Sequence, residues 1–295
     1  MSVPNRSFLL RHRFISALRD IDLKGIRRLS VLLPKLLLPA VDQAGKMEIQ
    51  TLHGVKLLID PAKDKGVELA LYQTGTYEKG TIQLLGDFLK SGSIFLDIGA
   101  NIGLMSTIAS KIVGEKGRVY AVEANPKTIT VLQHNLALNL CENVELIPLA
   151  LSNEKGTAVI YENWQVNRGG ASLISQGDTE GLPINTERLD ALFAPDSPVH
   201  LVKIDVEGFE LEVLKGGKEW FTAQQPVFII EVSTQRANQE GATPESIMSF
   251  VAELGNYSFF KQKGTKERRG KLVSVTTVAD MPEHDNLIAI PLKRI

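Results

Sequence analysis

The sequence predicts an α/β fold in which helices cover both faces of a mostly parallel sheet. Short apolar segments alternate with segments of helical periodicity from residue 79 onwards, an alternation typical of βαβ units. A glycine turn with the pattern D-x-G-x-x-x-G, from Asp97 to Gly103, joins the first central strand to a helix. With 295 residues, 43% of them hydrophobic, the chain can bury the core of such a sheet.

The expected elements follow in order. A hairpin around His53-Gly54 (47–60) and a helix (79–90) come first. Seven strands are then expected, at 94–97, 118–123, 144–151, 200–206, 226–232, 257–261 and 287–291. Between them, helices are expected at 106–113, after the cap Asn125-Pro126, up to about Lys215 before Gly216-Gly217, and after Thr243-Pro244.

Residues 152–190 interrupt this alternation, because they are polar, contain glycine and lack helical periodicity. We expect an inserted hairpin and loop after the third strand, on the side where an acceptor would bind. Its notable residues are Trp164, Asn167, Arg168, Gly169 and Gly170. Arg168 suits a carboxylate or phosphate, although a solvent-exposed arginine is the commoner outcome.

Residues 1–45 are expected to form a basic amphipathic extension, and residues 46–295 the catalytic domain. Residues 1–40 contain eight lysines and arginines against two aspartates, a net charge of +6, whereas the whole chain carries −1. Phe14, Ile15, Leu18 and Ile21 form an apolar helical stripe. Two interpretations stay open: a helix packed on the domain, or a helix lying on an anionic membrane surface.

Composition narrows the class of protein. The near-neutral net charge gives no reason to expect nucleic acid as a partner, and a single cysteine, Cys141, excludes an intrachain disulfide and a cysteine-based zinc cluster. No apolar run approaches the length of a membrane-spanning helix. Pro34 and Lys35 divide the apolar residues that a signal peptide would need. We expect a cytoplasmic protein, with peripheral membrane contact through residues 1–40 as an open alternative.

Polar residues gather where the expected strands end. Asp97, Glu123, Ala150, Asp205 and Glu231 all lie at or near carboxyl ends, the edge at which such sheets bind ligands. His200 lies at an amino end and is therefore excluded as a catalytic base.

The glycine turn favours a cationic ligand. Glu123 can accept hydrogen bonds from a ribose of NAD or of S-adenosylmethionine. A pyrophosphate needs three closely set glycines, whereas this turn has Gly99 and Gly103, and Asp97 would repel it. Asp97 suits an ammonium group, so a sulfonium cofactor with an amino-acid tail fits better than a nicotinamide. A Cβ at either glycine is expected to block the turn and the approach of the ligand.

Four ordered motifs carry a family resemblance. IFLDIGANIGLMS, YAVEANP, TERLDAL and LVKIDVEGFELEVLKG, with LYQTGTYEKGT upstream, resemble the FkbM family of S-adenosylmethionine-dependent O-methyltransferases over about residues 67–232. The resemblance implies a Rossmann-like, seven-stranded methyltransferase fold with S-adenosylmethionine as cofactor. It also implies these cofactor-binding residues: Glu78, Thr81, Asp97, Gly99, Ala100, Asn101, Gly103, Glu123, Ala124, Asn125, Ala150 and Asp205.

Methyl transfer to a hydroxyl needs a group that takes the proton. Asp205 and Glu207 flank the end of the fourth strand, and one of them is the expected base. The alternative is that Asp205 positions the ammonium group and Glu207 caps the next helix. Lys203, inside the same strand, needs a buried partner, and Glu231 on the neighbouring strand is expected to supply it.

Two further expectations concern ions. A basic cluster after the sixth strand comprises Lys261, Lys263, Lys266, Arg268, Arg269 and Lys271. Because most runs of charged residues are solvated, we expect these side chains to face water. The alternative is that they contact an anionic acceptor. Asp205, Glu207 and Glu231 would suit Mg²⁺ if any metal bound, but we expect no tightly bound metal.

The expected function is O-methylation of a sugar, glycan or natural-product hydroxyl. Two alternatives stay open, an NAD-dependent oxidoreductase and a non-catalytic cofactor-binding module. The sequence leaves the acceptor and the oligomeric state undetermined.

Overall fold

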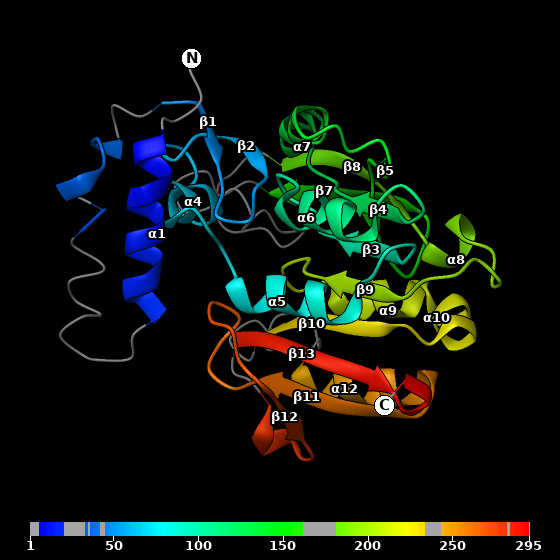
Figure 1. Ribbon diagram of the computed structural model, residues 1–295. Coiled ribbons are helices and arrows are strands. Elements are labelled where there is room, and N and C mark those ends of the chain that lie inside the picture. The colour runs from blue at the N-terminus through cyan, green and yellow to red at the C-terminus, as the bar shows by residue number, and fades with distance from the viewer. Residues whose placement is uncertain are drawn as a thin grey trace.

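The computed structural model describes residues 6–20, 33–34, 36–41, 45–161, 181–233, 243–281 and 284–294 (Figure 1). Within these residues, the central sheet has eight strands in the order β12-β11-β13-β10-β9-β3-β4-β5. Their bounds are β3 (Ile94–Ile98), β4 (Arg118–Val122), β5 (Val144–Ile147), β9 (Leu201–Ile204), β10 (Val227–Ser233), β11 (Tyr257–Gln262), β12 (Leu272–Val275) and β13 (His284–Pro291). The strands from β10 to β5 are parallel, and β13 runs antiparallel to both β10 and β11.

The α/β class is confirmed. Each of the seven expected strands has a counterpart in the central sheet, but β12 is an eighth strand that the sequence did not predict. Strand order reverses between β3 and β9, because the chain proceeds from β3 outwards to β4 and β5 and then returns to β9. Such a switch point opens a crevice beyond the carboxyl ends of the strands, where open α/β sheets bind ligands.

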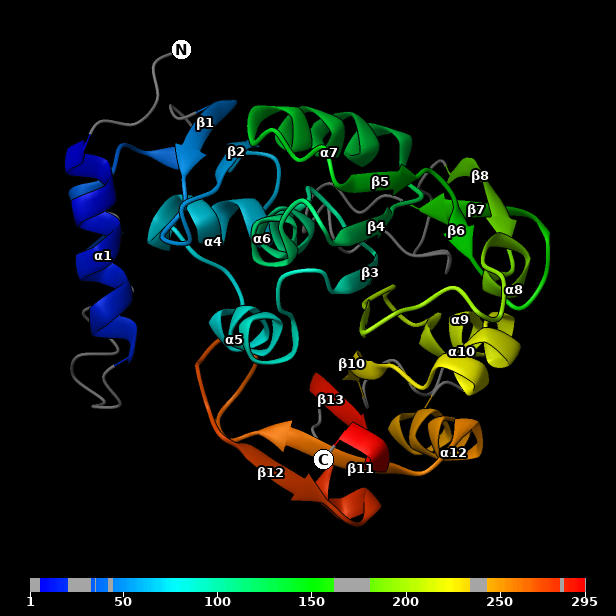
Figure 2. The ribbon, with the colours of Figure 1, turned by 45° about the vertical axis from the view of Figure 1, so that its right-hand side comes forward.

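Alternate residues of each strand enter two separate cores, one on each face of the sheet (Figure 2). Phe95 and Leu201 pack under the helices of the first face, while Leu96 and Val202 pack under those of the second. The first face carries α4 (Val67–Thr74), α5 (Lys79–Phe88), α6 (Leu104–Val113) and α7 (Pro126–Leu138). The second carries α8 (Leu189–Leu192), α9 (Glu210–Gly216), α10 (Lys218–Gln224) and α12 (Pro244–Leu254).

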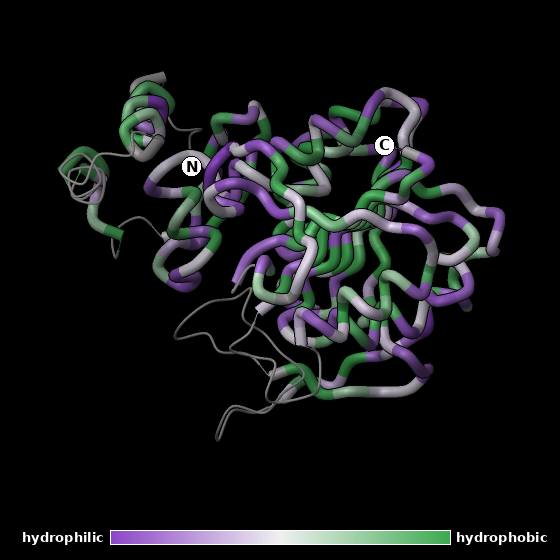
Figure 3. Tube along the Cα trace, turned by 90° about the horizontal axis from the view of Figure 1, so that it is seen from below, coloured by the Kyte–Doolittle hydropathy of each residue, from purple (hydrophilic) through white to green (hydrophobic). Residues whose placement is uncertain are grey.

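Because side chains alternate between the two faces along each strand, polar residues of neighbouring strands also come together on one face. Asp97 is directly opposite Lys203 in the β3–β9 register, and Lys203 is opposite Ile229 of β10. Asp97 and Lys203 therefore share the first face, and Glu231, two residues beyond Ile229, shares it as well. The strands themselves are hydrophobic through the centre of the molecule (Figure 3).

The predicted strand 144–151 is wrong at its end. β5 stops at Ile147, and Ala150–Leu151 form β6, which leaves the central sheet. Pro148 lies between them and has no N–H group, so it cannot continue the ladder.

The predicted hairpin of the insertion is present as β7 (Gly156–Tyr161) and β8 (Gly181–Glu187). With β6 they form a small sheet in the order β6-β8-β7. The loop residues Trp164, Asn167, Arg168, Gly169 and Gly170 lie outside the described residues.

The N-terminal part contains a helix and a hairpin. Strands β1 (Met47–Gln50) and β2 (Lys56–Ile59) pair antiparallel, as expected. Helix α1 (Arg6–Asp20) packs on α4, where Nε2 of His12 donates to the carbonyl oxygen of Tyr72 at 2.7 Å. Among the described helices, none has the length and apolar character needed to cross a bilayer. The proposed division at residue 45 stays a prediction.

Candidate active site

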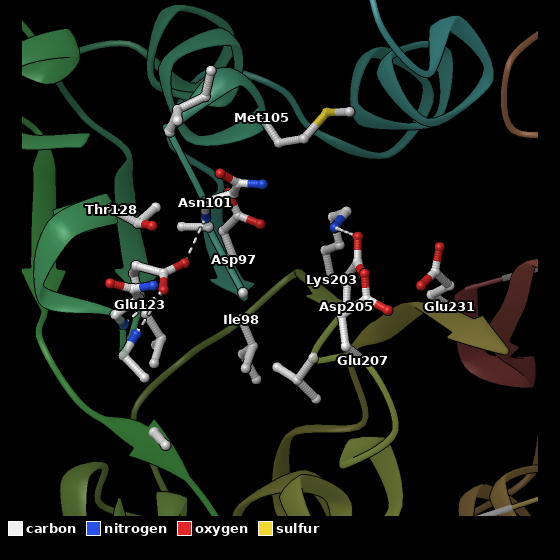
Figure 4. Close-up of a pocket in the computed structure, with 18 of the residues that line it drawn as sticks. Asp97, Ile98, Asn101, Met105, Glu123, Thr128, Lys203, Asp205, Glu207 and Glu231 are labelled. Atoms are coloured by element: carbon white, nitrogen blue, oxygen red, sulfur yellow. Dashed lines mark hydrogen bonds and ion pairs between the residues drawn. The ribbon is translucent and has the colours of Figure 1, made fainter. Parts of the chain in front are cut away.

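A pocket opens at the carboxyl ends of β3, β4, β9 and β10, at the switch point of the sheet (Figure 4). Its floor comes from the strand ends and its walls from the turn after β3, the start of α5, the small sheet and the loop before β12. Asp97 and Glu123 lie in one part of the pocket, and Lys203, Asp205, Glu207 and Glu231 in the other.

Asp97 is the second-last residue of β3 and is completely buried. The Ser106 hydroxyl of α6 donates to its Oδ2 at 2.5 Å, whereas Oδ1 has no hydrogen-bond partner among the described residues. Burial raises the pKa of the Asp97 carboxyl, although the charge of Lys203 opposes this shift. A buried carboxylate oxygen without a partner is costly, so this atom suits a cationic donor from a ligand.

Glu123 follows β4 and organises the glycine turn. Its Oε2 accepts from the backbone N–H of Asn101 at 2.9 Å, and its Oε1 accepts from those of Ala124 and Asn125 at 3.0 and 2.9 Å. Burial raises the pKa of Glu123, and these three hydrogen bonds oppose the shift. A carboxylate has about four lone-pair sites, so Glu123 keeps acceptor capacity toward the pocket.

The two glycines of the turn are needed for one of the two reasons expected, the conformation of the turn itself. Both have left-handed φ angles, +81° at Gly99 and +86° at Gly103. A Cβ at Gly99 would lie 1.9 Å from the carbonyl oxygen of Asp205, and one at Gly103 would lie 2.4 Å from Leu132. The expectation that a Cβ would block the turn is therefore confirmed, and the expectation that it would also obstruct the ligand stays a prediction.

Lys203 pairs with Asp205, the residue that directly follows its own strand. Its Nζ lies 2.8 Å from Oδ2 of Asp205, so the expected pair with Glu231 is wrong. Burial opposes the charge of Lys203, but Asp205, Asp97 and Glu78 outweigh it and raise the lysine's pKa. Conversely, burial favours protonation of Asp205, yet Lys203 and Lys266 hold its pKa below the ordinary value. Both groups are therefore charged at neutral pH, which disfavours Lys203 as a catalytic base.

Glu231 pairs instead with Lys266, which lies between β11 and β12. Lys266 Nζ contacts Oε1 of Glu231 and lies 2.8 Å from Oε1 of Glu78. Only 11% of the Lys266 side chain is exposed, so the expectation of a solvated lysine is wrong for this member of the basic cluster. Burial and the charge of Asp205 raise the pKa of Glu231 to about 8, although Lys266 opposes the shift.

The loop that carries Lys266 is anchored to α5. The backbone N–H of Gly80 donates to the carbonyl oxygen of Lys266 at 2.8 Å, and the Asp285 carboxylate accepts from the Lys266 N–H at 2.9 Å. Glu78, just before α5, has a left-handed φ of +44° and accepts from the Thr81 hydroxyl at 2.9 Å. These contacts hold the lysine against the pocket.

Three carboxylates have the spacing of a metal site. Oxygen atoms of Glu78, Asp205 and Glu231 lie within 4.8 Å of one another. Because Lys266 Nζ already contacts two of these groups, a lysine supplies the positive charge that an ion would bring. Glu207, which the sequence analysis grouped with Asp205 and Glu231, is outside this triad. The absence of a tightly bound metal stays a prediction.

Glu207 does not occupy the cap position of the following helix, so this part of the alternative is wrong, and the positioning of the ammonium group by Asp205 stays a prediction. α9 begins at Glu210 with Phe209 at the cap position, and the carboxylate of Glu210 accepts from the N–H groups of Val206 and Gly208. Glu207 has a left-handed φ of +55° and lines the pocket beside Asp205 (Figure 4).

Residues 97–258, more than half of the chain, match the family described as Methyltransferase FkbM domain. The chain belongs to the FkbM methyltransferase family. S-adenosylmethionine is the cofactor of this family, and the nicotinamide alternative is not supported.

Curated relatives match parts of this FkbM protein. The hexuronic acid methyltransferase AglP of Haloferax volcanii is 34% identical over 47% of this chain and 56% of its own. Methyltransferase sdnD of Sordaria araneosa is 31% identical over 44% of this chain and 62% of its own. A probable cobalt-precorrin-6B C(15)-methyltransferase of Sulfolobus acidocaldarius is 45% identical over 19% of this chain and 29% of its own. The chain thus spans less than two thirds of each of these relatives.

A solved FkbM methyltransferase from Methylobacillus flagellatus KT superposes on 95% of this chain and 58% of its own. Its sequence identity is 13% and its TM-score 0.47.

Most residues expected at the site come together in this FkbM protein. Those lining the pocket are Glu78, Asp97, Gly99, Ala100, Asn101, Glu123, Ala124, Asn125, Ala150, Asp205 and Glu207. Thr81 and Gly103 are buried but do not line it. The sequence analysis missed Tyr77 and Met105 and did not place Lys266 here. Nothing in the sequence distinguishes Lys266 from the other basic residues of its run, so its position in the pocket could not be predicted.

Proposed function

We propose that this protein transfers a methyl group from S-adenosylmethionine to a hydroxyl oxygen of a sugar, glycan or natural product. The observation that carries the proposal is the division of one pocket into two chemically different parts. Asp97 and Glu123 suit the cofactor, and the neighbouring carboxylates beyond β9 and β10 suit an acceptor hydroxyl.

The cofactor part fits S-adenosylmethionine group by group. The unpartnered Oδ1 of Asp97 would accept from the ammonium group, and the lone pair of Glu123 left by its three backbone donors would accept from a ribose hydroxyl. Apolar side chains beside Ala150, namely Leu149, Ile160 and Ile184, offer a surface for the adenine ring. Surplus negative charge stabilises the cationic sulfonium.

When bound, S-adenosylmethionine supplies an activated methyl group, so the protein mainly has to align the acceptor and take its proton. Asp205 is a poor base, because its carboxylate is ion-paired with Lys203 and has a lowered pKa. Glu231 is ion-paired with Lys266. We assign the base to Glu207 because it lines the pocket beside Asp205, with Asp205 and Lys203 as a fixed ion pair that positions the end of β9 beside it.

The charges of the pocket restrict the acceptor. Six acidic side chains line it, those of Glu78, Asp97, Glu123, Asp205, Glu207 and Glu231, against the lysines Lys203 and Lys266. An anionic group next to the reacting oxygen would be repelled. The relative named as a hexuronic acid methyltransferase supports a sugar acceptor. A sugar acid would have to keep its carboxylate away from this cluster, toward solvent.

Calorimetry tests the cofactor part of the pocket, and transfer of an isotope-labelled methyl group tests the acceptor part. Asp97→Asn should weaken binding of S-adenosylmethionine by more than about tenfold without unfolding the chain, because a charged acceptor for the ammonium group is lost. Glu207→Gln should keep cofactor affinity and lower turnover by roughly 10²–10⁴. Glu231→Gln is the matched variant, and a larger loss of turnover there would move the base to Glu231.

The acceptor search uses S-adenosylmethionine with a labelled methyl group, a panel of sugars and extracts of cells with and without the gene. Label in a hydroxyl-derived methyl ether supports the proposal. Cofactor binding with no transfer to any acceptor would favour a non-catalytic module, and unchanged affinity in Asp97→Asn would remove the pocket assignment.

A further inference from the structure

Helix α1 presents two different faces. One face packs on the domain: the Phe8 ring lies 4.5 Å from the His12 ring and 5.9 Å from the Tyr72 ring, and Ile15 is fully buried. Burial lowers the pKa of His12, and its Nε2 is hydrogen-bonded to the Tyr72 carbonyl, so this face is neutral. The interpretation of α1 as a helix packed on the domain therefore holds for one face only.

The opposite face is apolar and exposed. Leu10 and Phe14 are four residues apart, so they lie one turn above each other, and they are 59% and 55% exposed. Nearby, Leu36 is 78% exposed, and Arg11 Nη1 donates to the Leu37 carbonyl at 2.7 Å, which holds this segment beside α1. Large apolar side chains are thus exposed on α1 and the segment beside it, and α1 lies at the edge of the molecule (Figures 1 and 2).

Arginines border this apolar stripe. Exposed Arg13 lies on one side of it at helical spacing and exposed Arg11 on the other. Helix α1 contains four arginines and one acidic residue, Asp20 at its end. An apolar stripe bordered by arginines is the pattern of a helix that lies in the interface of an anionic bilayer.

We propose that the face of α1 formed by Leu10, Phe14 and the flanking Arg11 and Arg13 docks on an anionic membrane surface. The charge decides between a lipid surface and a second copy of this chain. In a symmetric dimer through this face, arginines would meet arginines and repel. A surface of anionic headgroups instead pairs with each arginine and takes up the apolar side chains. The proposal is independent of the enzymatic activity.

Docking through this face leaves the packing of α1 intact. The Lys79 ammonium donates to the Ser16 hydroxyl at 3.2 Å, and α4, on which α1 packs, contributes Val67 to the pocket wall. The membrane would therefore lie on the side of the molecule that carries α1 and α4.

Vesicle co-sedimentation of the full-length protein tests the proposal. We expect binding to vesicles of phosphatidylcholine mixed with phosphatidylglycerol, weak binding to phosphatidylcholine alone, and release by salt. Arg13→Ala should weaken binding about fivefold, and Leu10→Ser with Phe14→Ser by at least about tenfold. Leu140→Ser is the matched control, because Leu140 is 82% exposed and follows α7, which Figures 1 and 2 show on a different part of the molecule from α1.

Circular dichroism checks that each variant is folded. Equal binding to both kinds of vesicle, no binding to either, or an equal effect of Leu140→Ser would overturn the proposal. So would sedimentation velocity showing a dimer that the Leu10 and Phe14 changes dissociate, since the face would then bind a second copy.

Discussion

Replacing Gly99 by alanine tests the contact between β3 and the loop after β9. A Cβ at this position would lie 1.9 Å from the Asp205 carbonyl oxygen, whereas ordinary contacts are 3.4–4 Å. The carbonyl would have to retreat by about 1.5 Å, the difference between these distances, which is a shift of backbone rather than of a flexible side chain. The left-handed φ of +81° adds a second cost.

Two other glycines separate these costs. Gly92 has a similar φ of +84°, but a Cβ added there would meet nothing within 4 Å, so Gly92→Ala should cost only the left-handed conformation, about 1–2 kcal/mol. Gly86 lies within helix α5 with the same free space, so Gly86→Ala should stabilise by about 0.5–1 kcal/mol. Gly99→Ala should lose about 2–5 kcal/mol, since overpacking adds about 1–3 kcal/mol to the φ cost.

Urea unfolding of the three variants measures these differences in stability. The melting temperature should change by about 2–4 °C for each kcal/mol. Because Asp205 moves with its carbonyl, Gly99→Ala should also weaken cofactor binding, whereas Gly92→Ala should not. Equal destabilisation by Gly99→Ala and Gly92→Ala would refute the reasoning, because the chain would then absorb the added methyl group at no cost.

Three further outcomes are expected. Burial raises the pKa of Glu210 to about 7, so folding favours its protonated form and the stability of the protein falls as the pH rises from about 4.5 to about 7. Glu210→Gln should therefore be more stable than the wild type by about 1–3 kcal/mol at about pH 8. Urea unfolding midpoints measure this difference, which should disappear in acid. Lys266→Met leaves buried carboxylates unpaired and should cost about 3–5 kcal/mol near neutral pH, less in acid, as thermal unfolding would record. Chelation should alter neither the melting temperature nor cofactor affinity; a shift reversed by Mg²⁺ would contradict the role given to Lys266.

The central features of the fold follow from local sequence. Alternating apolar and helical segments predict the parallel strands, and the rule for switch points brings Asp97, Glu123 and Asp205 to one edge. These predictions succeed because burial on both faces leaves a strong pattern in each strand. Pro148 also carried a usable signal for the break between β5 and β6, since a residue without an N–H group cannot continue a ladder.

Contacts between distant segments left no such signal. The partner of Lys203 depends on side-chain reach, and its ammonium group pairs with Asp205, which directly follows its own strand. Lys266 belongs to a run of basic residues, of which it alone contacts the carboxylates of Glu78 and Glu231 among the described ion pairs. Gly99 is required by a carbonyl from a loop that follows it by about a third of the chain.

One wall of the pocket is held together by segments that are far apart in the sequence, and this separation has a consequence for protein synthesis. The N–H of Glu78 is bonded to Glu267, 189 residues later, and the Thr81 hydroxyl accepts from Asn286, 205 residues later. At about 5–20 residues per second, the ribosome needs on the order of 10–40 s to make the chain between the first two. Throughout that interval Lys266 has not been made. The nascent polypeptide can therefore complete the pocket wall at Glu78 only after the loop between β11 and β12 has emerged.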